Sequence, residues 1–293
     1  MKSGMQKCTI VVAIAVLNLS SIAAEPARLS VDGKERTYLI ERPSGQTPRP
    51  TLIMLHGFNG SGAQIARGSG LDRLAPQNGV VAIFPDKHPA LQGWNFFPSG
   101  KEPPSLIERT RATGIPDDVG YLKALIADLV RRGISDQRRV YLAGLSNGSF
   151  MVLRMICSNA GLLAAAGLVV GGMPEEVGAD CRPTKPTPLM TINGTSDQIV
   201  PYAGGPVLPG GIFKAWSAER LVAFFRQING CAGIAEPSLL PNAGANKLEL
   251  ARSKGCAGAP VEFYRVVGGG HSLPPELNVG QLLLDFFRDK VRP

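Results

Sequence analysis

The stretch that decides the fold is Arg139-Val140-Tyr141-Leu142-Ala143-Gly144-Leu145-Ser146-Asn147-Gly148. Its first half is a short apolar run typical of a buried strand, its second half has the pattern G-x-S-x-G, and a helical segment follows. Such a turn lifts a serine above the edge of a sheet, and its glycines leave the room that a tight turn needs. We therefore predict Ser146 as a nucleophile, with an ordinary glycine-rich turn as the alternative.

Short apolar segments recur along the chain, and each ends at Gly, Pro or Asp. They span 51–55, 80–84, 139–143, 165–170, 189–192 and 261–267. Segments of helical periodicity span 118–132, 147–158, 217–228 and 278–291. Near-continuous apolar strands indicate a sheet that is buried on both faces, and their alternation with helices predicts a doubly wound, mostly parallel α/β sheet. A hairpin over 28–43 opens it, and the absence of linkers and repeats predicts a single domain.

The first 24 residues have the pattern of a signal peptide. Two lysines precede an apolar run from Thr9 to Leu19, and small residues follow up to Ala24. The run is too short to cross a bilayer, and no later stretch is long and uncharged enough to do so. We expect cleavage after Ala23 or Ala24, a mature catalytic domain over 25–293, and a secreted protein, extracellular or periplasmic. A buried N-terminal helix is the alternative.

Export would place the cysteines in an oxidising compartment. Four remain after the signal peptide, and four allow three pairings. We favour the sequential one, Cys157 with Cys181 and Cys231 with Cys256. A zinc site is less favoured, because the chain has no C-x-x-C and its three histidines are not spaced with the cysteines. We expect no metal ion and no cofactor.

The chain is basic, with a formal net charge of +8. The basic residues are scattered, with no run longer than two adjacent arginines, which favours a basic solvated surface over a nucleic-acid partner. The sequence leaves the oligomeric state open.

A serine hydroxyl needs a base, and His271 is the predicted one. It follows the last apolar segment in Gly268-Gly269-Gly270-His271, where a glycine run lets a loop deliver the imidazole. The chain order of nucleophile, acid and histidine, typical of this architecture, places the acid before it. Asp197 fits best because it leaves the carboxyl end of the strand 189–192. Asp180 is the main competitor, and a turn-capping aspartate is the alternative for Asp197.

Acyl transfer also needs donors aimed at the developing oxyanion. One is the backbone N–H of Asn147, directly after the nucleophile. The second predicted donor is the N–H of Phe58, in His56-Gly57-Phe58-Asn59-Gly60 after an early strand, with a simple turn as the alternative. His56 is expected to be structural.

Specificity is expected from loops over 60–70, 88–116 and 203–214. Their few charges, many glycines and several aromatic residues suggest a shallow, moderately apolar cleft that prefers short acyl or hydroxyacyl esters to long-chain lipids. Trp94 is the best aromatic candidate for a substrate wall, and a packed core aromatic is the alternative.

In combination and order, these motifs resemble the polyhydroxybutyrate depolymerase and feruloyl esterase family of secreted α/β-hydrolases. The resemblance covers nearly the whole mature chain. It rests on His56-Gly57, Asp117-Asp118-Val119-Gly120-Tyr121, Gly144-Leu145-Ser146-Asn147-Gly148, Gly194-Thr195-Ser196-Asp197 with Val200-Pro201-Tyr202, Asn229-Gly230-Cys231 and Gly268-Gly269-Gly270-His271. It implies the α/β-hydrolase fold, a Ser146–Asp197–His271 triad, and a Cys157–Cys181 bridge close behind the nucleophile helix.

The chain also departs from the family. Ser272-Leu273-Pro274 stands where the family usually has a tryptophan two residues beyond the histidine, and Ser149 replaces a common glycine or alanine. These changes leave the triad intact but put the rim of the acyl pocket in doubt.

The expected function is hydrolysis of short-chain, hydroxyalkanoate or hydroxycinnamoyl esters through an acyl-enzyme. The chain has no length for the binding module that polymer-active relatives commonly carry, so a soluble or amorphous ester is favoured. A serine peptidase and a non-catalytic binding protein on a hydrolase fold are the alternatives.

Overall fold

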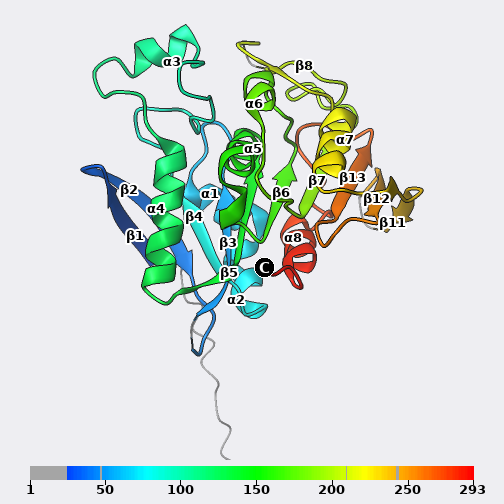
Figure 1. Cartoon of the computed structure of the whole chain (residues 1–293), viewed down its shortest axis with the longest axis horizontal. Coiled ribbons are helices and arrows are strands. Elements are labelled where there is room, and N and C mark those ends of the chain that lie inside the picture. The colour runs from blue at the N-terminus through cyan, green and yellow to red at the C-terminus, as the bar shows by residue number, and fades with distance from the viewer. Residues whose placement is uncertain (1–24, 47, 209, 242–243) are drawn as a thin grey trace, which may run out of the picture.

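A computed structural model describes residues 25–46, 48–208, 210–241 and 244–293. A twisted central sheet runs through the molecule with helices on both faces (Figure 1). The predicted signal peptide over 1–24 lies outside the described residues. Within those residues, no helix combines the length and the apolar character that a membrane crossing requires.

Eleven of the described strands form the central sheet, in the order β1-β2-β4-β3-β5-β6-β7-β13-β12-β10, and β11 pairs with β12. The strands are β1 (Glu25–Val31), β2 (Lys34–Glu41), β3 (Arg49–Leu55), β4 (Val81–Pro85), β5 (Ser135–Leu145), β6 (Ala165–Val169), β7 (Leu189–Gly194), β10 (Gly233–Ile234), β11 (Ser238–Leu240), β12 (Lys247–Lys254) and β13 (Val261–Val267). Neighbours from β4 to β13 are parallel, and pairs at both edges are antiparallel. This confirms the predicted doubly wound, mostly parallel sheet.

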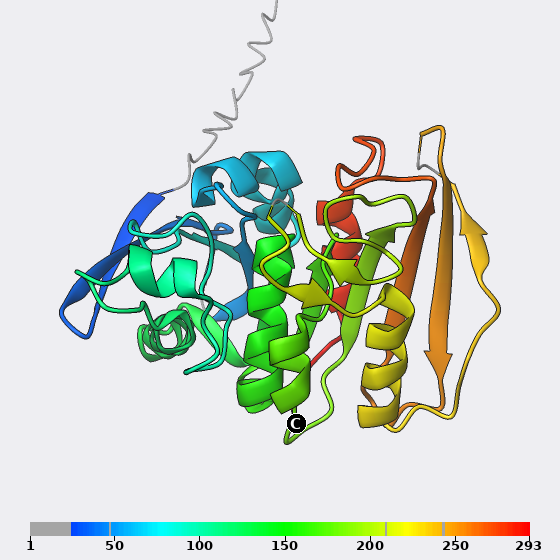
Figure 2. The same ribbon diagram turned by 90° about the horizontal axis from the view of Figure 1, so that it is seen from above.

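The helices form two layers. They are α1 (Gly62–Ser69), α2 (Leu71–Gln77), α3 (Pro104–Arg109), α4 (Asp118–Arg131), α5 (Asn147–Asn159), α6 (Glu175–Asp180), α7 (Ala218–Ile228) and α8 (Val279–Phe287). In Figure 2, α4, α5 and α7 cover one face of the sheet, whereas α1, α2 and α8 cover the other. Each layer packs its own hydrophobic core against the sheet, so the central strands β4, β6 and β7 are buried throughout.

Several elements differ from the sequence predictions. The expected loop 60–70 contains α1, the expected loop 88–116 contains α3, and the last helix ends at Phe287 rather than Val291. The sequence of α1 is weakly helical, but Ser61 caps it and Ile65 is buried against the sheet layer. Tertiary packing therefore stabilises a helix that local composition does not predict.

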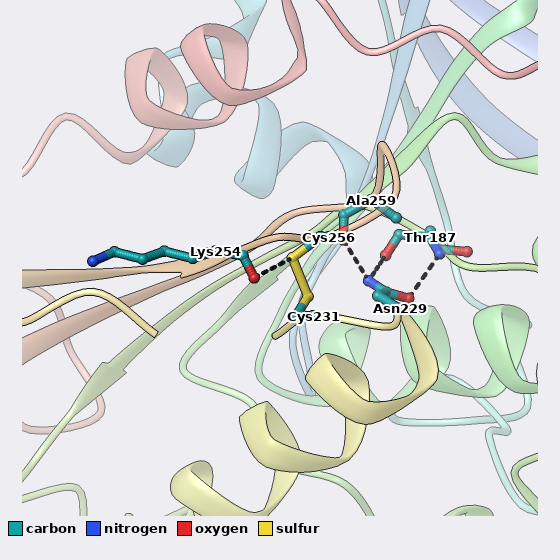
Figure 3. The surroundings of a disulfide bond; sticks show 6 residues. All are labelled: Thr187, Asn229, Cys231, Lys254, Cys256 and Ala259. Carbon is teal, nitrogen blue, oxygen red and sulfur yellow. Dashed lines mark hydrogen bonds between the residues drawn. A yellow bond between two sulfur atoms is a disulfide. The ribbon is translucent and has the colours of Figure 1, made fainter. Parts of the chain in front are cut away.

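Two disulfides tie elements on the α5–α7 side. Cys157 near the end of α5 bonds Cys181 after α6, and Cys231 after α7 bonds Cys256 beyond β12. Figure 3 shows the second bridge beside Asn229, whose side chain donates to the carbonyls of Thr187 and Ala259 and accepts from the Thr187 N–H. The bridges close loops of 24 and 25 residues, and a loop of this size contributes about 3 kcal/mol.

Candidate active site

Ser146 lies on a sharp turn between β5 and α5. Its backbone has φ 54° and ψ −115°, a strained conformation for a residue with a side chain. Both flanking glycines are required by close packing. A Cβ on Gly144 would lie 2.3 Å from the carbonyl carbon of Gly148, and one on Gly148 would lie 2.6 Å from the carbonyl oxygen of Leu55. The turn is therefore the strained strand-to-helix elbow that the sequence predicted, and it exposes the hydroxyl above the sheet.

The structure brings the three residues of the predicted triad together. His271 Nε2 is 2.9 Å from Ser146 Oγ, and its Nδ1 is 2.8 Å from Asp197 Oδ2. The Asp197 carboxylate is buried, and its Oδ1 accepts the N–H groups of Ile199 and Val200 at 2.8 and 3.0 Å. An ionised Asp197 requires the ring proton on Nδ1, which leaves Nε2 as the acceptor for the serine proton.

Asp197 and His271 lie close together because their loops follow adjacent strands of the sheet. β7 and β13 are parallel neighbours, so the loops that leave their carboxyl ends meet at the same edge of the sheet. The Ser196 N–H donates to the Gly269 carbonyl at 2.9 Å, and the Gly268 N–H donates to Thr195 Oγ1 at 2.8 Å. A Cβ on Gly194 would lie 2.4 Å from the Gly269 oxygen, so only glycine permits this close approach of the loops.

Asp180, the competing acid, lies elsewhere. It is the last residue of α6 and pairs with Lys101 Nζ at 2.7 Å. The hydrogen bond from Lys101 lowers the pKa of this exposed carboxylate. Asp197, not Asp180, is bonded to His271.

The loop after β3 lies directly beside the nucleophile. A Cβ on Gly57 would lie 3.5 Å from Ser146 Cβ, so Gly57 and Phe58 border the place where an ester carbonyl must sit. The Phe58 side chain is 49% exposed and lines the mouth of the site. The backbone of this loop is thus in reach of a reacting ester, although the Phe58 N–H as an oxyanion donor stays a prediction.

His56 holds this loop in shape. Its Nε2 accepts the Lys87 N–H at 3.2 Å, so the ring proton is on Nδ1, which donates to the Gly57 carbonyl at 2.7 Å. The Gly60 N–H donates to the same carbonyl at 3.0 Å. Burial lowers the pKa of His56, which favours the neutral ring that both contacts require. Because C=O and N–H of a trans peptide point in opposite directions, the Phe58 N–H points away from the His56 ring.

Asn147 is the first residue of α5, where helix geometry provides no partner for the N–H. Its side-chain Oδ1 accepts the Trp94 backbone N–H at 2.6 Å. Trp94 itself is only 3% exposed, and its indole N–H donates to the His56 carbonyl at 2.9 Å. Trp94 borders the cleft but has the burial of the packed aromatic that was the alternative for it, and its contact with substrate stays a prediction.

A cleft of about 1370 Å³ crosses the carboxyl edge of the sheet at Ser146 and His271. One half, which we call the polar half, lies over the α1–α2–α8 face. Its polar lining residues are Gln64, Arg67, Ser69, Arg73, Gln77, Glu276 and Asn278, and they alternate with apolar ones such as Leu74, Leu273, Leu277 and Val279. The other half lies over the α5 face and is lined by Phe96, Phe97, Phe150, Leu208, Ile212 and Phe213. The cleft carries more charge than expected, because α1 and α2 line it with Arg67 and Arg73.

The aromatic half is a packed cluster of phenylalanine rings. Phe213 lies on the small hairpin of β8 (Gly205–Pro206) and β9 (Lys214–Ala215). Its ring centroid is 5.1 Å from that of Phe96, 5.8 Å from Phe97 and 5.3 Å from Phe150, all with edge-to-face geometry. Such rings offer both faces and edges to another aromatic group.

The structure shows contacts of Ser149 and His56 that the sequence analysis did not predict. Ser149, the departure from the family pattern, is fully buried under the elbow. Its Oγ lies 2.6 Å from the Gly144 carbonyl oxygen and accepts the Val169 N–H at 3.1 Å, so it joins β5 to β6 below Ser146. His56 has a structural role, as expected, and that role is to fix the loop beside the nucleophile. In the described part of the chain, no group of three or more His, Cys, Asp or Glu residues could hold a metal ion.

Comparison with known proteins identifies relatives of this chain and solved structures with the same fold. No protein-family model matches the chain. Feruloyl esterase B of Piromyces equi is 30% identical over 247 residues, which cover 81% of this chain and 42% of that protein, so the chain spans less than half of its relative. The solved acetyl xylan esterase from Aspergillus awamori superposes with a TM-score of 0.63 at 12% identity, covering 90% of this chain and 99% of that one. A thermostable esterase superposes with a TM-score of 0.58 at 17% identity, over 92% and 64% of the two chains.

The fold is that of the α/β-hydrolases, as predicted. Within them, the chain is similar to feruloyl esterases, which confirms that part of the predicted resemblance. The polyhydroxybutyrate depolymerase part stays a prediction.

Proposed function

We propose that this chain is a carboxylic-ester hydrolase in which Ser146 is the nucleophile, His271 the general base and Asp197 the residue that orients the base. The observation that carries the proposal is the continuous hydrogen-bonded line from Asp197 through His271 to a serine on a strained elbow. The name of the Piromyces relative, a feruloyl esterase, supports ester hydrolysis.

The reaction has two steps. Ser146 Oγ attacks the ester carbonyl while His271 Nε2 takes the hydroxyl proton, and the resulting imidazolium then gives that proton to the leaving alcohol. Water attacks the acyl-enzyme by the same route, which releases the acid and restores Ser146. In both steps the backbone N–H groups of Phe58 and Asn147 would stabilise the negative oxygen of the tetrahedral intermediate.

The two halves of the cleft suggest how the ester lies. His271 must reach the leaving oxygen, and the residues that follow it, 272–279, line the polar half. We therefore place the alcohol in the polar half and the acyl group against the phenylalanine cluster. An aromatic acyl group such as a hydroxycinnamoyl group fits that cluster better than a flexible lipid chain does, because flat rings gain edge and face contacts there. Short-chain and hydroxyalkanoate esters are the weaker candidates.

Export is part of the proposal. The two disulfides of the described chain fit an oxidising compartment, and the leader pattern over 1–24 supplies the route. The partner is then an extracellular or periplasmic ester, with no cofactor required.

A substrate panel tests the function. Purified protein and its Ser146→Ala variant are assayed on methyl ferulate, ethyl 3-hydroxybutyrate, and 4-nitrophenyl acetate and palmitate, with the amide of ferulic acid as the peptidase-type control. We expect the highest kcat/KM on methyl ferulate and none by the variant. Absence of turnover on every ester would refute the function, a maximum on palmitate would make the protein a lipase, and faster cleavage of the amide would make it an amidase or peptidase.

A further inference from the structure

We propose that Trp94 is a positioning residue that ties together the two segments carrying the oxyanion donors, Phe58 and Asn147. The inference rests on the proposed esterase function. It gives Trp94 a role beyond the predicted contact with substrate.

Trp94 makes one bond to each donor segment. Its indole N–H donates to the carbonyl oxygen of His56, two residues before Phe58, at 2.9 Å. Its backbone N–H donates to the side-chain Oδ1 of Asn147 at 2.6 Å. The Trp94 and His56 rings are also in contact, with centroids 5.1 Å apart.

The segment around Trp94 presses directly on the elbow. A Cβ on Gly93 would lie 2.5 Å from Asn147 Oδ1, so only glycine lets the backbone come this close. Because the two segments are packed this closely, a shift of Trp94 would also displace the Asn147 side chain.

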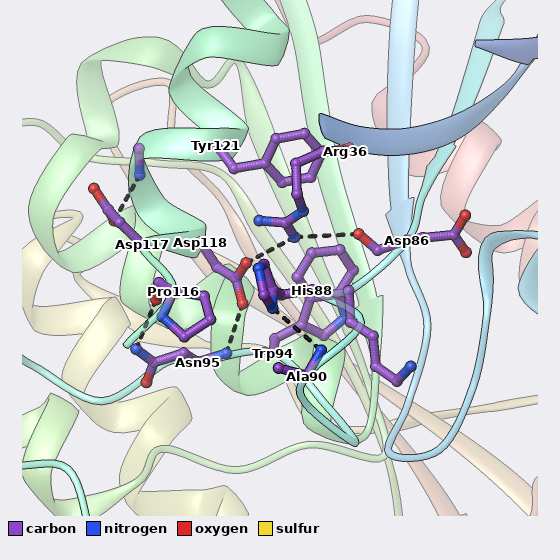
Figure 4. A network of polar contacts seen from close by, with 12 residues as sticks. Arg36, Asp86, His88, Ala90, Trp94, Asn95, Pro116, Asp117, Asp118 and Tyr121 are labelled. Carbon is purple, nitrogen blue, oxygen red and sulfur yellow. Dashed lines mark hydrogen bonds and ion pairs between the residues drawn. The ribbon is translucent and has the colours of Figure 1, made fainter. Parts of the chain in front are cut away.

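A buried ion pair anchors Asn95, the residue after Trp94, as Figure 4 shows. The N–H of Asn95, the next residue, donates to Asp118 Oδ2 at 2.8 Å. Asp118 Oδ1 is 2.8 Å from Arg36 Nη2, and both side chains are almost completely buried. Arg36 Nη2 also donates to the Asp86 carbonyl at 3.2 Å. The ion pair thus fixes both ends of the 86–95 loop.

This arrangement explains the part of the Asp117-Asp118-Val119-Gly120-Tyr121 motif that the triad does not use. Asp117 caps α4 by accepting the Gly120 N–H at 2.8 Å, whereas Asp118 points inward to the loop that carries Trp94. The motif therefore both starts a helix and anchors the donor segments.

The consequence concerns the transition state more than substrate binding. Donors that are held apart at a fixed distance stabilise a tetrahedral oxyanion, and a misplacement of about 1 Å can cost up to about a hundredfold in rate. Loosening Trp94 should therefore lower kcat with little change in KM.

The experiment compares Trp94→Phe with Trp216→Phe. Trp216 is also buried, but it packs on Phe224 and Arg220 and does not line the cleft. With methyl ferulate we expect Trp94→Phe to lower kcat by about tenfold at nearly unchanged KM. Its inhibition constant for phenylboronic acid, which forms a tetrahedral adduct with a nucleophilic serine, should rise by a similar factor. Trp216→Phe should change neither quantity.

Asn147→Ala removes the other bond and keeps the backbone donor, so it carries the test if Trp94→Phe does not fold. The double variant should be little worse than either single one, because both bonds serve one geometry. Wild-type kcat in the folded variants, or a rise in KM alone, would overturn the inference. If the wild-type protein hydrolyses no ester, the proposed function itself fails, whereas active wild type with Trp94→Phe equal to Trp216→Phe refutes only the role of Trp94.

Discussion

Asp197 and His271 are 74 positions apart in the chain, yet Asp197 Oδ2 and His271 Nδ1 lie 2.8 Å apart. The contact exists because their strands, β7 and β13, are hydrogen-bonded neighbours in the sheet. The carboxylate is buried and already accepts two backbone N–H groups through its other oxygen, so the imidazole has one orientation to adopt. That orientation aims Nε2 at Ser146.

Loss of the nucleophile or the base should abolish turnover. We expect Ser146→Ala and His271→Ala each to lower kcat on an activated ester by at least about 10⁴. The double variant should be little worse, because the two residues act as a unit. Burst-phase and steady-state assays measure both quantities, and multiplicative losses would contradict a shared role.

Two aspartate-to-asparagine variants test which aspartate orients His271. Asp197→Asn should lower kcat by roughly 10³ to 10⁴, since an amide at this place favours the wrong imidazole tautomer. Asp180→Asn is the control, because Asp180 only pairs with Lys101 on the surface of α6. A larger loss in Asp180→Asn would show that Asp197 is not the acid.

If the acyl group lies against the phenylalanine cluster, removal of the Phe213 ring should change the substrate specificity. Phe213→Ala should lower kcat/KM for methyl ferulate about tenfold or more relative to 4-nitrophenyl acetate, because the small acyl group does not need that ring. Phe224→Ala is the matched control, since Phe224 packs on Trp216 and does not line the cleft. Equal losses on both esters would place the acyl group elsewhere.

Glu41 on β2 should make stability depend on pH. Burial, and then the charges of Asp72 and Glu25, raise the pKa of Glu41 to about 7 from an ordinary 4.5. The folded state therefore binds this proton more tightly than the unfolded state does. The resulting stabilisation is fully present below about pH 4.5 and is lost as the pH rises through 7.

Thermal unfolding at pH 5 and pH 8 measures this effect. The Tm of wild type should fall more between these two values than the Tm of Glu41→Gln, whose side chain does not titrate. Glu35→Gln is the control on the same strand, because Glu35 is exposed and pairs with Arg28. Parallel pH profiles for wild type and Glu41→Gln would contradict the prediction.

The two bridges should be found in the exported protein. Peptide mapping without reduction should link Cys157 to Cys181 and Cys231 to Cys256. Replacing either pair by serine should lower the Tm by several degrees, since each bridge closes a loop worth about 3 kcal/mol. Free thiols at all four positions would contradict both bridges.

Much of the site was predictable because its signals are local. The elbow around Ser146 needs glycine at two fixed positions, and the runs before Asp197 and His271 mark strand ends that meet at one edge of a parallel sheet. The helix α1 was not predictable, because its weak helical sequence is stabilised by burial of Ile65 in the core and by the close approach of Gly62 to the Phe84 carbonyl. The strand β12 was missing from the sequence prediction, although the sequence carries a signal for it. Leu248 and Leu250 alternate with polar residues, and both are buried.

The sequence by itself determined the fold class and predicted the nucleophile, the base and the order of the triad, because strand periodicity and turn chemistry act over a few residues. Only the tertiary structure brought Asp197 and not Asp180 to His271, placed the arginines of α1 and α2 and the aromatic rings on opposite sides of the cleft, and buried Trp94 between His56 and Asn147. These features depend on contacts between residues tens of positions apart. Such contacts arise from how the strands and helices pack, and no local pattern in the chain encodes which partner each side chain meets.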